Sequence, residues 1–468
     1  MKKTPSRLTR IEADSLGARE VPASAYWGIH TLRALENFQF SGQRIPRELI
    51  QALVLVKKAA CLTNLELGLL EKSIGQAIVL ACDEILSGAL AEEFPLDAVQ
   101  GGAGTSANLN VNEVLANRAL ELLGHPRGSY DLIHPIEHVN LHQSTNDVYP
   151  TAVRIAVIFR FREVSRELET LQRAFQCKET AWSRVMKMGR TEMQPAVPIS
   201  LGAEFGAFAE AFARDRWRTA KCEERLRVVN LGGTAIGTGM TAPKSYIFLV
   251  TERLRELSGI GLTRAENCID ATANADAFTE VAGILNACTG NLIKVCRDLR
   301  LLHFLGEIRL PPMQAGSSIM PGKINPVILE AILSAAFRMR AEDQTVAQAV
   351  AMGTLQINEF MPLIAFSLLS WLFLCGQSVK ALARHVDGIE ADPATCQRFL
   401  ENSPTLITAL LPLIGYQQAQ AVSKEFMLSK EQNLRKFLSE RFGEDAIRRA
   451  LSSEALLLPG NPDNFRKP

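Results

Sequence analysis

A strict heptad pattern in the second half of the chain constrains the fold more than any other sequence feature. Apolar residues between Phe278 and Leu302 recur at alternating spacings of three and four residues, which is typical of long helices packed side by side. They are Phe278, Val281, Leu285, Cys288, Leu292, Val295, Leu299 and Leu302. This seam predicts a bundle of long helices.

The same helical spacing recurs elsewhere in the chain. A helix expected from Thr151 onward carries an apolar stripe from Val153 to Phe175, and further helices are expected over 198–229, 326–350 and 359–385. Alternating strand patterns are scarce, so we predict an all-α fold. Because such helices are longer than a small domain is wide, at about 1.5 Å per residue, we also expect an oligomer.

Glycine and proline turns divide the 468 residues into three predicted domains. Residues 1–142 are expected to form a mixed helical domain and 143–392 the central helical bundle. Residues 393–468 are expected to form a small C-terminal helical domain. The most apolar stretch, residues 360–375, is shorter than the roughly 20 residues that cross a bilayer and predicts a buried helix.

Charge and cysteine usage limit the classes of partner. The chain has 51 Lys and Arg against 50 Asp and Glu, so its net charge does not favour nucleic acid or an anionic membrane. Nine cysteines occur singly, without a CxxC pair, which is typical of reduced buried thiols. With no secretory signal recognised at the start, we expect a cytoplasmic protein.

Three polar segments, 101–110, 143–151 and 314–326, interrupt the helical pattern. Each taken alone fits a capped turn, since Ser, Thr and Asn are common helix caps. The third combines glycines with Ser317, Ser318, Lys323 and Asn325 just before a predicted helix. Hydroxyls, a cation and an amide in such a mobile segment favour a loop that closes over an anion.

The sequence GSSIMPGKINP in that segment resembles the signature loop of the aspartase/fumarase superfamily, whose enzymes release fumarate from a succinyl skeleton. GGAGTSANLN, HQSTNDVYPT, GRTEMQPAVPISLG and NLGGTAIGTG extend the resemblance over nearly the whole chain, and STNDVYPT favours the ammonia-lyase branch. The resemblance implies a three-domain fold and a homotetramer with a central twenty-helix bundle. It also implies active sites shared by three subunits.

For function, the resemblance implies reversible elimination of ammonia from L-aspartate to give fumarate, without cofactor or metal. Ser317 matches the general base, whose ionisation Lys323 would assist. The two carboxylates of the dicarboxylate substrate would be held by hydroxyls, an amide and a cation. Matching positions are Thr105, Ser144, Thr145 and Ser318 for the β-carboxylate, and Thr191, Lys323 and Asn325 for the α-carboxylate.

Glu192 departs from the family, which most often has His at this position. Together with Glu330 it would place two acids at one site, which favours a cation between them. We therefore hypothesise that Glu192 helps Asn146 to receive the amine. The alternative is a solvated or helix-capping acid.

A second departure is the link over 303–308, which is shorter than the family's Ser-Gly-Pro-Arg stretch. Since it leads into the signature loop, it predicts altered loop closure or substrate choice. Three alternatives to aspartate as substrate therefore stay open. They are fumarate hydration as in class II fumarases, an ammonia-lyase acting on another amino- or N-substituted succinate, and an inactive structural homologue.

Overall fold

The computed structural model describes residues 8–457, which are mostly helical with four short two-stranded sheets. The chain divides into two compact units. Unit 1 contains residues up to Ser165, then Trp217–Thr289 and Phe337–Cys375. Unit 2 contains Arg166–Arg216, Gly290–Ala336 and the residues from Gly376 onward. The all-α prediction is confirmed, while the three domain boundaries stay a prediction.

Five long helices contribute residues to both units. They are α5 (Thr145–Ala181), α6 (Leu201–Leu226), α9 (Asp276–Leu305), α10 (Val327–Ala351) and α11 (Met361–Asp387). Each predicted helix is confirmed to within a few residues, except that α5 begins six residues before Thr151. All eight residues of the α9 seam are at most 5% exposed, because the heptad spacing keeps them on one face.

The early start of α5 places Pro150 inside the helix, where the sequence led us to expect a break. Proline has no N–H, so the carbonyl four residues earlier, that of Asn146, lacks its helical donor. The Asn230 side-chain amide supplies that donor at 3.0 Å. A distant side chain thus allows the helix to begin directly after Ser144.

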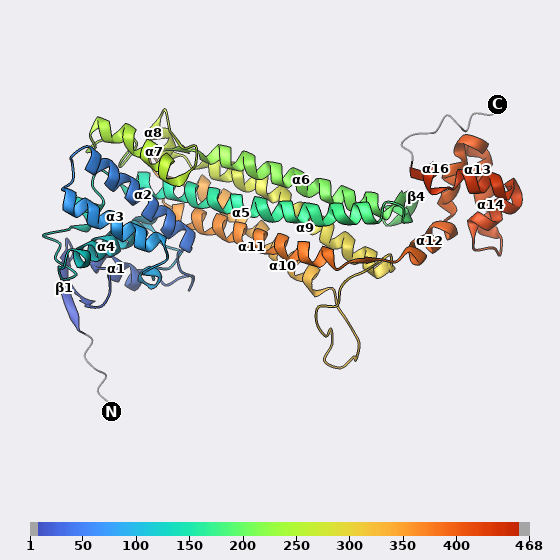
Figure 1. The fold of residues 1–468 in the computed structure, drawn as a ribbon, viewed down its shortest axis with the longest axis horizontal. Coiled ribbons are helices and arrows are strands. Elements are labelled where there is room, and N and C mark those ends of the chain that lie inside the picture. The colour runs from blue at the N-terminus through green and yellow to red at the C-terminus, as the bar shows by residue number, and fades with distance from the viewer. Residues whose placement is uncertain (1–7, 458–468) are drawn as a thin grey trace. The chain divides into compact units, whose positions relative to one another are not determined.

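In unit 1 the long helices pack side by side (Figure 1). Arg154 of α5 lies over Phe278 of α9, and Asn286 of α9 donates to Asp343 of α10. The smaller elements of this unit are β1 (Thr9–Asp14), β2 (Gly17–Pro22), α1 (Ile29–Asn37), α2 (Arg47–Glu66), α3 (Lys72–Leu86), α4 (Thr105–Leu122), β5 (Val228–Val229), α7 (Lys244–Ser258), β6 (Thr263–Arg264) and α8 (Cys268–Ala273).

Unit 2 has its own apolar core around a β-hairpin that the sequence did not predict. Strands β3 (Met186–Thr191) and β4 (Gln194–Ser200) pair antiparallel, and Met186 and Met188 are buried among the C-terminal helices. The remaining elements of this unit are β7 (Ile308–Arg309), β8 (Glu390–Ala391), α12 (Pro393–Asn402), α13 (Leu411–Leu428), α14 (Leu434–Phe442), α15 (Glu444–Ala450) and α16 (Ser453–Leu457).

Two sequence expectations concern buried groups. All nine cysteines lie in the described part of the chain and are free thiols, and all except Cys177 are buried. Helix α11 is the one described helix long and apolar enough to cross a membrane. However, 61% of its most apolar window is buried, and the core helix of a water-soluble protein passes the same test. This agrees with the expected buried helix.

Candidate active site

The residues Ser144–Asn146 form the first turn of α5 in unit 1. The Ser144 hydroxyl accepts from Asn146 N at 3.2 Å, and Ser144 N donates to the Asp147 carboxylate at 3.0 Å. Each side chain thus satisfies a backbone N–H that the helix start leaves without a partner. This reciprocal cap fixes the positions of the hydroxyls and of the Asn146 amide.

Asp147, which the sequence did not indicate as a site residue, holds this turn in place through hydrogen bonds from backbone N–H groups. Its side chain is fully buried and also accepts from Gly232 N and Thr234 N, both at 3.0 Å. Burial raises the Asp147 pKa to about 6, although the three backbone donors oppose the shift. The glycine-rich segment around Gly232 therefore supports the start of α5.

Thr145 belongs to a second buried network of hydrogen bonds. Its hydroxyl accepts from the Asn108 amide at 3.0 Å. The Asn140 side-chain oxygen accepts from Asn108 at 3.2 Å, Asn112 at 3.1 Å and the Lys57 amine at 2.7 Å. Lys57 is fully buried, and this desolvation lowers its pKa to about 7. The Asn140 oxygen, which accepts from three donors, holds the Thr145 side chain in place through Asn108.

We expect the Lys57 amine to make stability depend on pH. Between about pH 7 and 10.5 the folded chain holds this amine neutral and the unfolded chain holds it charged, so folding releases a proton. Relative to a Lys57→Met variant, the wild-type free energy of unfolding should rise by about 2 kcal/mol from pH 7 to pH 9. Urea titrations of both proteins at each pH measure this. Parallel pH profiles would contradict it.

Thr105 is the first residue of α4 and lies in unit 1 with Ser144–Asn146. The turn before it is left-handed at Gly102, Ala103 and Gly104, with φ of +78°, +55° and +93°. A Cβ at Gly104 would lie 2.4 Å from the Tyr149 ring, so only glycine fits there. The exposed Thr105 hydroxyl donates to Gly102 O at 2.8 Å.

The signature loop lies in unit 2, between β7 and α10. Its neck is closed by Gly316 N, which donates to Lys323 O at 2.7 Å, and by the Asn325 amide, which donates to Gly316 O at 2.8 Å. A Cβ at Gly316 would lie 2.6 Å from Lys323 O, so the neck requires glycine. Ser318 and Lys323 are exposed on this loop.

The Ser317 hydroxyl oxygen is the acceptor for two backbone N–H groups of its own loop. This Oγ accepts from Ile319 N at 3.2 Å and from Met320 N at 2.9 Å. Backbone N–H groups directed at one oxygen favour its negatively charged form. The neck also keeps the backbone of Lys323 close to that of Gly316, the residue before Ser317.

Thr191 and Glu192 lie at the tip of the β3–β4 hairpin. Glu192 and Met193 form its two-residue turn with φ of +51° and +62°, a conformation in which glycine and asparagine are usual. Non-glycine residues in this region cost about 1–3 kcal/mol each and are concentrated at functional sites. Among the described residues Glu192 lies in this turn and at no helix start, and its side chain is exposed, which also agrees with the alternative of a solvated acid.

A buried ionic cluster holds this hairpin in unit 2. The Lys187 ammonium lies 2.6 Å from Glu204 and 2.8 Å from Glu307, and Arg190 donates to Glu307 at 2.8 Å. The side chains of Lys187 and Glu307 are 1% and 0% exposed. These residues were missed because nothing in the sequence near them identifies their partners.

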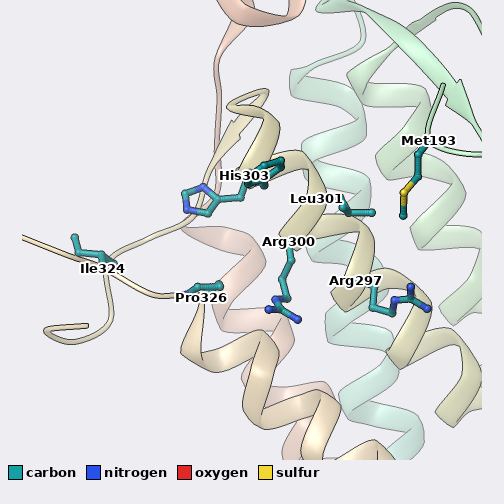
Figure 2. Close-up of a pocket in the computed structure, with 8 residues that line it drawn as sticks. Met193, Arg297, Arg300, Leu301, His303, Ile324 and Pro326 are labelled. Carbon is teal, nitrogen blue, oxygen red and sulfur yellow. The ribbon is translucent and has the colours of Figure 1, made fainter. Parts of the chain in front are cut away.

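Unit 2 also contains a pocket of about 530 Å³ that is lined by α9, the hairpin tip and the signature loop (Figure 2). Arg297 and Arg300 project from α9 beside Met193 and Pro326. Arg300 forms an ion pair with Glu330 at 3.3 Å. A site that Glu192 and Glu330 share stays a prediction.

The fold and these segments define a lyase: the profile of a family described as lyase matches residues 17–341, and the chain belongs to this family. It is 44% identical to an aspartate ammonia-lyase of Bacillus sp., over 90% of this chain and 92% of that protein. It is 43% identical to the aspartate ammonia-lyase of Escherichia coli strain K12, over 90% of each.

Solved structures agree with this assignment. A Brucella melitensis protein titled fumarate lyase:delta crystallin superposes with a TM-score of 0.93 at 45% identity, over 97% of this chain and 100% of the other. A class II fumarase from Schistosoma mansoni superposes with a TM-score of 0.92 at 31% identity, with the same coverage. The resemblance inferred from the sequence motifs is thus confirmed.

Proposed function

We propose that the protein catalyses the reversible elimination of ammonia from L-aspartate to give fumarate. The observation that carries this proposal is the Ser317 oxygen with its two backbone N–H donors, on a loop that also presents Lys323 and Asn325. The identity to aspartate ammonia-lyases over 90% of the chain supports the choice of aspartate.

The difficult step is removal of a proton from the carbon beside the β-carboxylate. The C–H electron pair moves into that carboxylate and gives a doubly negative aci-carboxylate, which the enzyme must stabilise. Hydroxyls of Thr105, Ser144, Thr145 and Ser318 would donate to it, and preorganised donors of this kind are worth about 2.7–4 kcal/mol each. The dianion then collapses to the C=C bond and the amine leaves as ammonia.

In this mechanism the ionised Ser317 takes the proton. The N–H groups of Ile319 and Met320 and the positive charge of Lys323 would stabilise that alkoxide, and closure of the loop would exclude water. Lys323, Asn325 and Thr191 would hold the α-carboxylate. With both carboxylates held, the proton to be removed faces a single base.

We further propose a cytoplasmic homotetramer in which three subunits contribute to each active site. The site residues fall into separate groups: Thr105 and Ser144–Asn146 in unit 1, and the hairpin tip and the signature loop in unit 2. Exposed Phe304, Phe337 and Phe373 on the long helices supply apolar surface for contacts between subunits. The free thiols support a reducing compartment.

A substrate panel on the purified protein tests the reaction. We expect fumarate absorbance to rise with aspartate and not with malate. The class II fumarase neighbour makes hydration of fumarate the second candidate, and turnover of malate alone would establish it. Turnover of none of the succinyl substrates would instead favour an inactive homologue.

Glu192 provides a test of amine recognition. Replacing Glu192 with Gln removes the charge that we propose receives the ammonium group together with Asn146. Since hydrogen bonds to charged groups contribute about 1.5–3 kcal/mol, kcat/KM for aspartate should fall about tenfold or more. Glu425→Gln, which removes a half-exposed carboxylate elsewhere in unit 2, is the control. Unchanged kinetics in Glu192→Gln would remove Glu192 from the site.

A further inference from the structure

The Thr145 hydroxyl is buried and uses only part of its hydrogen-bonding capacity. Thr145 is 9% exposed, and its oxygen accepts from the Asn108 side chain at 3.0 Å. Within the described part of the chain this hydroxyl donates to no residue. Since buried polar groups are normally hydrogen-bonded, a hydroxyl that accepts and does not donate has its proton available for a ligand.

The side chains behind Thr145 decide which way its O–H bond points. An asparagine side chain has one donor end and one acceptor end, so each hydrogen bond fixes the next. The Asn140 amide donates to the Gln143 carbonyl at 3.0 Å, which turns the Asn140 oxygen the other way. There it accepts from Lys57 at 2.7 Å and from Asn108 at 3.2 Å. The NH₂ group of Asn108 therefore faces both Asn140 and Thr145, and the Thr145 oxygen can only accept from it.

Lys57 lies at the far end of this series of hydrogen bonds. Its side chain is fully buried, and within the described residues its amine bonds Asn140 alone. A methionine would fill the same space without desolvation of an amine, so packing does not explain a lysine here. The amine does hold the acceptor end of Asn140 in place. Turning the Asn140 amide over would break its bonds to both Lys57 and Gln143.

Asn108 also lowers the stability of the network. Its side-chain oxygen is buried and has no hydrogen-bond partner among the residues that the structure describes. A buried acceptor without a donor is costly, whereas a leucine at this position would leave none. What Asn108 supplies in return is the donor that faces Thr145.

We propose that Lys57, Asn140 and Asn108 are positioning residues that fix the direction of the Thr145 O–H bond, so that this hydroxyl donates to the substrate β-carboxylate. The inference rests on the proposed function, which places that carboxylate at Thr145. A hydroxyl free to rotate would at times turn its lone pairs toward the carboxylate, which repels them. A donor that is already oriented needs no reorganisation when the charge on the carboxylate doubles in the aci-carboxylate.

A double-mutant cycle between Asn108 and Thr145 tests this role. Thr145→Val removes the donor, and kcat for aspartate should fall about 10²–10³-fold. Asn108→Leu leaves the hydroxyl free to rotate, so kcat should fall about tenfold, the value of one hydrogen bond. KM should change less than about threefold, because the second charge exists only after proton removal. In the Thr145→Val background Asn108→Leu should lower kcat by less than about twofold.

Asn64→Leu is the matched control, because it replaces another buried asparagine that bonds the same segment. Asn64 donates to Leu141 O at 3.3 Å and bonds the His142 ring at 2.8 Å. Within the described residues it has no hydrogen bond to Thr145 or to Asn108. Its effect on kcat should therefore be the same with and without the Thr145 hydroxyl.

Lys57→Met tests the far end of the series. We expect kcat to fall about threefold or more in the wild-type background and less than about twofold in the Thr145→Val background. Urea denaturation checks that the variant is folded. Three results would overturn the proposal. They are equal losses in both backgrounds for Asn108→Leu, equal losses in both for Lys57→Met, and a loss in Asn64→Leu that also depends on Thr145.

The proposed function fails separately. If aspartate is not turned over, the dissociation constant of succinate, which carries both carboxylates and no leaving group, is measured by calorimetry. It should rise about threefold in Asn108→Leu and stay unchanged in Asn64→Leu. That result would support the positioning role and reject the aspartate activity. No succinate binding by the wild type, or the same dissociation constant in Asn108→Leu, would reject both.

Discussion

Replacing Ser317 with alanine is expected to lower kcat for aspartate by about 10²–10⁴-fold, the usual contribution of a positioned general base. Alanine lacks the Ser317 Oγ that we propose as the base. In the wild type this oxygen accepts from Ile319 N at 3.2 Å and from Met320 N at 2.9 Å, and these N–H groups would stabilise its ionised form. Fumarate formation monitored by absorbance, at saturating aspartate, measures the effect. The fold should be unchanged, because the two N–H groups lie on exposed residues and can donate to water.

Ser334→Ala is the control for this result. Ser334 is an exposed serine of α10 whose hydroxyl donates to the Glu330 carbonyl at 3.0 Å, an exchange that helices tolerate. We expect its kcat to stay within twofold of the wild type. Full activity in a folded Ser317→Ala protein would refute the role of Ser317 as the base.

Replacing Glu307 with glutamine should lower the free energy of unfolding by about 3–5 kcal/mol. Glu307 is fully buried and neutralises Lys187 at 2.8 Å, and it also accepts from Arg190. Without the Glu307 charge, Lys187 stays buried with Glu204 as its one remaining carboxylate partner in the described part of the chain, and a buried charge with incomplete compensation is costly. Urea denaturation at one fixed protein concentration measures the loss.

Two further variants isolate the buried charge as the cause. Glu425→Gln breaks a half-exposed pair with Arg441, and such pairs contribute at most about 1 kcal/mol. Adding Lys187→Met to Glu307→Gln removes the buried Lys187 ammonium that has lost its Glu307 partner. The double variant should therefore be more stable than Glu307→Gln alone. If Glu307→Gln were no less stable than Glu425→Gln, the cluster would not hold the hairpin.

The buried side-chain pairs that hold the site residues in place could not be predicted from the sequence. Lys57 and Asn140 are 83 residues apart, and Arg190 and Glu307 are 117 apart. A lysine or a glutamate in a sequence carries no mark that identifies its partner, because a pair of charges forms wherever the fold brings them together. The motif residues themselves were identifiable, since the segments that carry them are continuous and resemble those of a known superfamily.

The β3–β4 hairpin shows the same limit for local structure. Pro195 and Pro198 interrupt any strand pattern in this segment, and its tip holds Glu192 and Met193 in left-handed conformations. The intrinsic conformational preferences of these residues therefore disfavour such a hairpin. Packing of Met186 and Met188 among the C-terminal helices and the ion pairs of Lys187 overcome these preferences.

The sequence alone determined the long helices, because amphipathic spacing is a local property that specifies both a helix and its buried face. All eight seam residues of α9 and the stripe of α5 are buried accordingly. Only the tertiary structure decided how α5 begins, with the Asn230 amide replacing the donor that Pro150 lacks. It also decided that the Ser317 oxygen faces two N–H groups. These features depend on backbone direction and on distant partners, which residue spacing does not specify.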